Sequence, residues 1–157
     1  MEGIIYIAIL AVVSVFAINV IFTAVKSYNN LIITRNINNA ASNFLERVSR
    51  EIRFATAVDA SQSVFNAHPG KLFLNTINQD TEAETALEFY LDGAALVASS
   101  TEGVKYLTSS STAIASLIFR EVNAATTSAI KIEIEIASTK DNFQKSEKFY
   151  LTAALRQ

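Results

Sequence analysis

The apolar positions at the start of the chain form one unbroken run. Residues 3–25 read GIIYIAILAVVSVFAINVIFTAV and carry no charge, and the acidic Glu2 stands immediately before them. A helix of this length, at about 1.5 Å per residue, measures about 34 Å, which exceeds the roughly 30 Å of a bilayer's hydrocarbon core. The pattern predicts a membrane-spanning helix. A cleaved secretory signal is disfavoured, because such signals start with basic residues and have a shorter apolar centre.

Helical spacing of apolar positions continues beyond this run. No Gly or Pro occurs between Gly3 and Pro69, and apolar residues recur at intervals of three and four, as in an amphipathic helix. These residues are Ile37, Ala41, Phe44, Leu45, Val48, Ile52 and Ala55. We therefore expect one helix from about Gly3 to Ala57, about 80 Å long. Residues 1–25 would lie in lipid, and residues 26–57 would have one face to bury.

The polar residues of the second part fall on its other faces. Arg47, Arg50 and Arg53 are expected to be solvated there, or to pair with Glu46 or Glu51 at helical spacing.

Residues 58–157 are expected to form a globular antiparallel β domain, in which the period changes to two after a turn at His68-Pro69-Gly70. Asp92-Gly93 predicts a hairpin, and Ile130 to Ile136 alternates strictly between an apolar and a charged face. Strands are expected at Leu72 to Ile77, Leu87 to Leu91, Ala94 to Ala98, Val104 to Leu107, Ser116 to Arg120, Ile130 to Ile136 and Phe149 to Leu155. One-sided strands joined by short turns predict an antiparallel sheet with a single buried face that covers the helix, and so an α+β fold.

Composition and charge indicate one globular domain and disfavour or exclude several classes of function. About 130 residues follow the apolar run, which suits one domain. The first 57 residues carry five Lys/Arg and three Asp/Glu, whereas the remainder carries eight and twelve. A mildly acidic globular part disfavours a nucleic-acid partner. The chain has no cysteine, which excludes disulfides, thiolate metal sites and a cysteine nucleophile.

The remaining polar residues predict no active site. His68, the only histidine, is expected to be a turn residue and not a ligand or base. Asp80, Glu82 and Glu84 offer carboxylates for calcium, but their spacing fits no EF-hand, and a solvated acidic loop is favoured. The polar residues 109–112 have no base partner, so they indicate a loop. We predict a protein that is not an enzyme and has no cofactor or metal; a tethered hydrolase would need a convergent nucleophile and base.

Several segments resemble one family. The start MEGIIYIA, at residues 1–8, is similar to the region just past the cleavage site in the type IV pilin and type II secretion pseudopilin superfamily, where a Glu precedes an apolar run. LEFYLDG at 87–93, YLTS at 106–109, LIF at 117–119 and the strand at 130–136 are similar to J-type pseudopilins and W-type minor pilins. The resemblance covers nearly the whole chain. It implies a pilin-like fold and a non-catalytic minor pilin or pseudopilin that assembles into, primes or caps a pilus or secretion filament.

The resemblance also implies sites, partners and a location. Glu2 would pair with the freed amino terminus of a neighbouring subunit, or else lie solvated at the membrane interface. Asn19 would bond either between packed helices or to its own backbone. The implied partners are other pilin or pseudopilin subunits, membrane lipid, assembly platform proteins and, where a leader exists, the prepilin peptidase. The protein would be a single-pass inner-membrane protein with an exported carboxyl-terminal domain, and later part of a cell-surface or periplasmic filament with a methylated amino terminus.

One feature departs from the family. Its short basic leader ending in Gly does not precede Met1. We therefore expect an upstream start, a processed or truncated form, or a protein that the peptidase does not cleave. Basic residues follow the span, so the positive-inside rule alone places the carboxyl-terminal side in the cytoplasm, and a basic leader would reverse this.

The alternative function is a membrane-tethered binding or sensor domain that does not polymerise.

Overall fold

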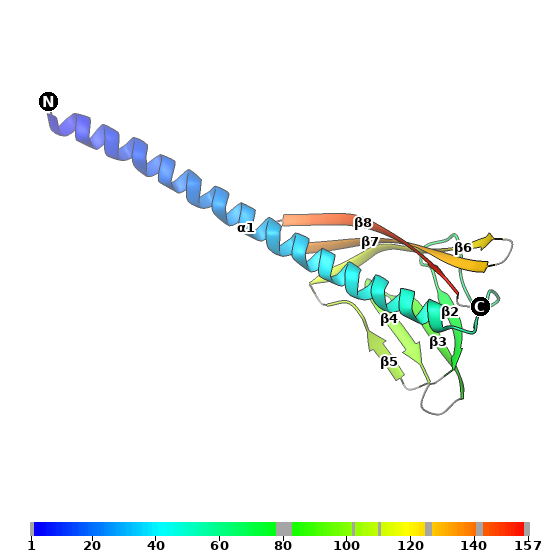
Figure 1. Cartoon of the computed structure of the whole chain (residues 1–157). Helices are drawn as coiled ribbons and strands as arrows, with labels where there is room; N and C mark the ends of the chain where they lie inside the picture. Colours follow the sequence, from blue (N-terminus) through cyan, green and yellow to red (C-terminus); the bar gives the residue numbers. More distant parts are fainter. Residues whose placement is uncertain are drawn as a thin grey trace.

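One helix spans the first third of the chain in the computed structural model (Figure 1). The structure describes residues 2–77, 83–101, 103–109, 111–124, 127–140 and 143–155. Helix α1 (Glu2–Phe54) contains 53 residues and has no Gly or Pro after Gly3. It ends at Phe54 and not at Ala57 as expected, because Ala57 and Val58 form strand β1 and the Thr56 amide donates to the Asn75 carbonyl at 2.8 Å.

Five strands form a first antiparallel sheet in the order β1-β2-β3-β4-β5. Its members are β1 (Ala57–Val58), β2 (Leu72–Ile77), β3 (Glu84–Asp92), β4 (Ala95–Ser100) and β5 (Gly103–Tyr106). The predicted β3–β4 hairpin is confirmed, with Asp92 paired to Ala95 across the two-residue loop. Gly93, the first loop residue, has φ 62°, a conformation that glycine adopts without steric cost.

Three longer strands form a second antiparallel sheet in the order β6-β7-β8. They are β6 (Thr112–Ala124), β7 (Thr127–Lys140) and β8 (Phe143–Ala154). The expectation of a single sheet is therefore wrong. Alternation tells which side chains are buried, but it does not tell which strands share hydrogen bonds. The chain leaves the first sheet after β5. It forms a turn there, in which the Thr112 amide donates to the Ser109 carbonyl at 3.0 Å.

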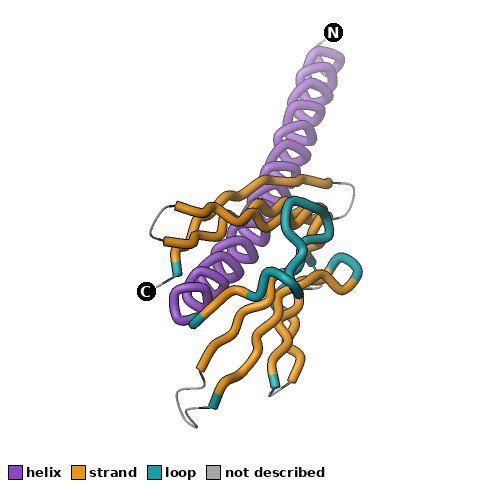
Figure 2. The backbone as a smooth tube through the Cα atoms, turned by 90° about the vertical axis from the view of Figure 1, so that its right-hand side faces the viewer, coloured by secondary structure: helices purple, strands orange, loops and turns teal. Residues whose placement is uncertain are grey.

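The second half of the helix lies against both sheets and forms the core with them, chiefly through β7 and β8 (Figure 2). The predicted helix stripe is confirmed, with Leu45 only partly buried and Ile33 extending it by one turn. Its buried members are Ile33, Ile37, Ala41, Phe44, Val48, Ile52 and Ala55, each at most 2% exposed. The predicted apolar face of β7 is also buried, through Ile130, Ile132, Ile134 and Ile136. The fold is α+β, as expected.

The loop between β1 and β2 joins the two sheets. Phe65 bridges Phe119 of β6, and the Gly70 amide donates to the Leu117 carbonyl at 2.9 Å. A Cβ added to Gly70 would lie 3.0 Å from that carbonyl oxygen and 3.1 Å from the Phe119 ring. Gly70 therefore allows a close approach of two backbones that a larger residue would prevent.

Candidate functional site: the exposed half of helix α1 and the groove at its far end

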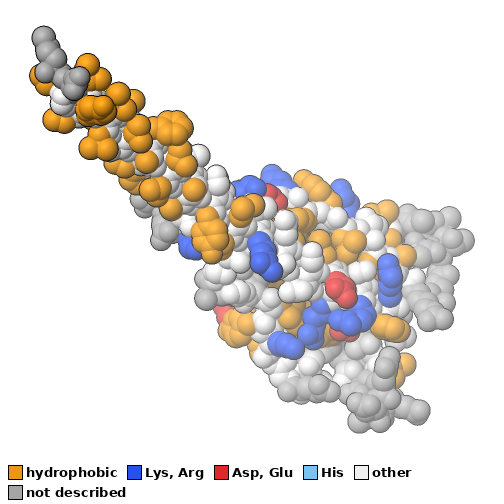
Figure 3. Space-filling model, turned by 60° about the vertical axis from the view of Figure 1, so that its left-hand side comes forward, with side chains coloured by type: hydrophobic (Ala, Val, Ile, Leu, Met, Phe, Trp, Pro, Cys, Tyr) orange, Lys and Arg blue, Asp and Glu red, His pale blue; other side chains and the backbone are white. Residues whose placement is uncertain are grey.

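The first half of helix α1 extends away from both sheets, and we call residues 3–25 the apolar rod. Figure 3 shows hydrophobic side chains covering this rod, whereas Lys, Arg, Asp and Glu gather over the globular part. The large hydrophobic side chains of the rod are between 51% exposed, at Val25, and 73% exposed, at Tyr6. An apolar surface this continuous requires lipid or another protein around it. The helix is long and apolar enough to cross a membrane.

Three polar side chains interrupt the rod. The Ser14 hydroxyl donates to the Leu10 carbonyl at 2.8 Å, and the Thr23 hydroxyl donates to the Asn19 carbonyl at 2.9 Å. The Asn19 side chain is exposed, and it has no hydrogen-bond partner within the described part of the chain. Ser14 and Thr23 are thus satisfied by their own helix, whereas the Asn19 amide is available to a second helix.

Glu2 opens helix α1, but its side chain lies outside the part of the chain that the structure describes. Its pairing role stays a prediction.

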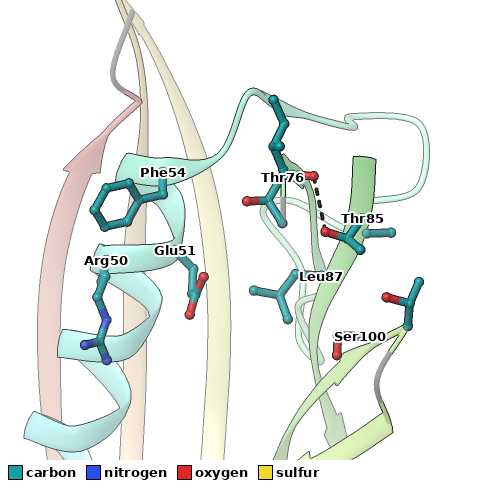
Figure 4. A pocket seen from close by; sticks show the side chains of 10 residues that line it. Arg50, Glu51, Phe54, Thr76, Thr85, Leu87 and Ser100 are labelled. Atoms are coloured by element: carbon teal, nitrogen blue, oxygen red, sulfur yellow. Dashed lines mark hydrogen bonds between the residues drawn. The ribbon is translucent and has the colours of Figure 1, made fainter. Parts of the chain in front are cut away.

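A second surface lies where the last turns of α1 face the five-stranded sheet. Figure 4 shows a cavity there, with Arg50, Glu51 and Phe54 on the helix side. The sheet side is formed by Thr76, Thr85, Leu87 and Ser100, and the Thr85 hydroxyl donates to the Thr76 carbonyl at 3.3 Å. The cavity holds about 440 Å³. It is wide enough for side chains of a partner, and it is open to solvent along one side.

Two smaller hollows, of about 350 and 300 Å³, continue this cavity along β5. Arg47 and Lys105 line both, and Arg50 links the first of them to the larger cavity. We call the three together the helix–sheet groove. Within the described ranges, Arg47, Arg50 and Lys105 take part in no ion pair.

Arg47 differs from the expectation of a solvated arginine. It is half-buried, and its Nε is buried without a hydrogen-bond partner. Arg50 and Arg53 are exposed, as expected. A buried guanidinium nitrogen without an acceptor is costly, so an anionic group entering the groove would gain a charge-assisted hydrogen bond there.

The clearest electrostatic cluster lies elsewhere, on the outer face of the three-stranded sheet. Arg120 donates to both carboxylate oxygens of Glu133, at 3.1 and 3.3 Å, and Lys131 lies 2.8 Å from the same carboxylate. These hydrogen bonds, first from Arg120 and then from Lys131, lower the pKa of Glu133. Beside the β3–β4 hairpin the Tyr106 hydroxyl donates to Asp92 at 3.0 Å, and this hydrogen bond raises the pKa of Tyr106. Both are surface contacts, and the hollow of about 100 Å³ beside Glu133 is small.

The other residues singled out from the sequence have structural positions. The His68 Nδ1 accepts a hydrogen bond from the Leu117 amide at 3.2 Å, which holds the turn against β6. Glu84 is exposed at the start of β3, while Asp80 and Glu82 lie outside the described residues. No group of three or more His, Asp or Glu in the described ranges is placed to hold a metal ion.

Sequence reasoning missed the helix–sheet groove. Arg47 and Lys105 are far apart in the chain, and no local pattern links a helix face to an edge strand that follows much later. The only available signal was the three arginines spaced at i, i+3 and i+6, which is also the pattern of an ordinary solvated face.

No protein-family model, curated protein or solved structure matches this chain. Its function is therefore inferred from the residues and the geometry described above.

Proposed function

We propose that this protein is a non-catalytic minor pilin or pseudopilin that anchors in the membrane by its apolar rod and joins a type IV pilus or type II secretion filament. One observation carries the proposal. A single helix leaves residues 3–25 exposed and buries the stripe from Ile33 to Ile52 in its own domain. Such a helix suits a subunit that first resides in lipid and later packs its rod against the rods of neighbours.

The assembly mechanism follows from the rod. Lateral packing of apolar helices supplies most of the contact, and Asn19 adds an interhelical hydrogen bond of about 0.6–2 kcal/mol. Glu2, in the first turn of α1, pairs with the amino terminus of the next subunit and sets the axial register, as the resemblance to pilins implies. An unpaired carboxylate at the edge of lipid is costly, so pairing is the more stable arrangement.

A photo-crosslinking experiment tests this function. p-Benzoylphenylalanine is placed at Phe16, in the rod, or at Gln62, an exposed position of the β1–β2 loop, and cells with the complete native system are irradiated. We expect adducts with pilin-like subunits or with a second copy from Phe16, and none from Gln62. A protein that remains monomeric at both positions would overturn the proposal. Glu2→Gln should reduce the Phe16 adducts, because the register contact is lost.

Mass spectrometry of the native amino terminus gives an independent test. A mature, methylated end a few residues before Glu2 would support cleavage by a prepilin peptidase. An intact formylated or acetylated Met1 would contradict it.

The helix–sheet groove favours a second candidate, a membrane-tethered binding or sensor domain that does not polymerise. Its unpaired cations, Arg47, Arg50 and Lys105, form a surface suited to an anionic partner. In that case Arg50→Glu would abolish function while Phe16 gives no adducts. In a filament subunit, Phe16 adducts form whether or not Arg50 is replaced.

A further inference from the structure

The three-stranded sheet reaches the neck of the molecule, where the apolar rod enters the globular part. Lys140 pairs with Phe143 at this end of β7 and β8, and its Nζ lies 5.7 Å from the centre of the Tyr28 ring. A few residues on, the Lys145 ammonium donates to the Thr34 hydroxyl at 3.0 Å. Figure 1 shows this end of the sheet pointing along α1 toward the amino terminus. Contacts between distant parts of the sequence thus hold a lysine beside the end of the rod.

Helix geometry gives the depth of this contact in a bilayer. Tyr28 lies three residues past Val25, which is about 4.5 Å along the helix axis. The headgroup layer beyond the hydrocarbon core is about 5–8 Å thick on each side. With the core ending at Val25, the Tyr28 ring and the Lys140 ammonium lie within the headgroups. Tyr28 is 61% exposed, and tyrosine is enriched at this level of membrane proteins.

The charges at the neck are unbalanced. Lys145 is neutralised by Glu147 at 2.6 Å, and Lys148 lies 3.6 Å from Glu135. Lys26 is exposed. Neither Lys26 nor Lys140 has an acidic partner within the described ranges, and Asp141, which follows Lys140, lies outside those ranges. Figure 3 shows Lys and Arg side chains where the orange rod meets the globular part.

We propose that the neck formed by Lys26, Tyr28 and Lys140 binds the phosphate of anionic lipid headgroups and holds the three-stranded sheet against the bilayer. The Lys140 ammonium beside the Tyr28 ring faces one headgroup phosphate, and Lys26, about 200° around α1 from Tyr28, faces another at nearly the same depth. This surface goes beyond filament assembly, and it rests only on the membrane anchor that both candidate functions share.

The absence of cysteine from the chain allows a clean test. Thr139→Cys, an exposed position beside Lys140, is labelled with bimane in the full chain. The protein, in a neutral detergent, is titrated with phosphatidylglycerol or with phosphatidylcholine while the emission is recorded. We expect a saturable change with phosphatidylglycerol only. Each cation near an anionic surface contributes about fivefold, so Lys26→Gln/Lys140→Gln should weaken the apparent affinity about 25-fold.

A matched control removes the same two charges far from the neck. Arg53→Gln/Lys131→Gln, at the other end of α1 and toward the far end of β7, should leave the affinity for phosphatidylglycerol unchanged. Equal responses to the two lipids, or equal losses in the two double variants, would overturn the proposal. So would an emission change that depends on protein concentration without lipid, because the neck would then contact a second copy.

A second label separates this proposal from failure of the anchor. Val15→Cys, in the middle of the apolar rod, carries the same dye in phosphatidylglycerol vesicles that contain lipids brominated on the acyl chains. Quenching at residue 15 together with no lipid response at residue 139 refutes headgroup binding alone. A lack of quenching at residue 15 refutes the anchor, and with it both the headgroup site and the proposed function.

Discussion

Replacement of Phe44 by alanine tests whether the second half of α1 is a core element of the globular part. Phe44 is 1% exposed and lies on the helix stripe between the two sheets. Deleting a buried phenylalanine ring costs about 3–5 kcal/mol, because the transfer energy is lost and a cavity remains. Small domains are stable by about 5–15 kcal/mol, so Phe44→Ala should remove a large share of the free energy of unfolding.

Phe54→Ala is the matched control, since it makes the same deletion on the same helix at a side chain that is 55% exposed. Both variants of the full chain are unfolded by urea in a neutral detergent, and cleavage by a short pulse of protease reports the unfolded fraction. With a slope of about 2 kcal/mol per M urea, Phe44→Ala should lower the midpoint by about 2 M. Phe54→Ala should lower it by far less. Equal shifts in the two variants would refute the assignment of the helix stripe to the core.

Three further changes give distinct results. Gly70→Ala brings a methyl group to within 3.0 Å of the Leu117 carbonyl oxygen and should cost about 1–3 kcal/mol in the same urea assay. Gly93→Ala places a side chain at φ 62° and should cost about 1 kcal/mol, which a thermal melt of the full chain would detect. The pKa of Glu133 is lower in the folded state than in the unfolded state. Its pairing therefore stabilises the fold at pH values above the unfolded pKa, and this stabilisation is lost as the pH falls through the folded pKa. Arg120→Gln should therefore reduce stability at neutral pH and flatten the loss of stability on acidification, and an unchanged profile of unfolding midpoint against pH would contradict this.

Elements with a regular pattern were predictable. Strand β2 matches its predicted bounds, Leu72 to Ile77, and the core of β7 matches the strict alternation from Ile130 to Ile136. The ends of β7 were missed, because small and polar residues there pair with neighbouring strands without an apolar contrast. Strand β6 was predicted from Ser116 but begins at Thr112, because a bulge between Ile114 and Ser116 breaks the period. The bulge lets Ile114 and Leu117, three residues apart, both face the core.

The surfaces were harder to predict than the elements. The apolar rod is local in sequence, so its exposure followed from composition. The helix–sheet groove and the neck each combine residues from α1 with residues of strands much later in the chain, such as Lys140 beside Tyr28. Which strand end meets which helix turn depends on the separation into two sheets, and the alternation pattern carries no information on that separation.

The uninterrupted course of helix α1 has a mechanical consequence. Helix α1 has no glycine or proline between Gly3 and its last turn, so it has no site at which it would kink. Torque or tension applied at its amino end is therefore transmitted along the helix to the core. Strands β7 and β8 run alongside it (Figure 1), and their ladder bonds lie across the strands. An axial load would therefore strain many of these bonds in parallel instead of breaking them one at a time, and the globular part would resist unfolding as one stiff body.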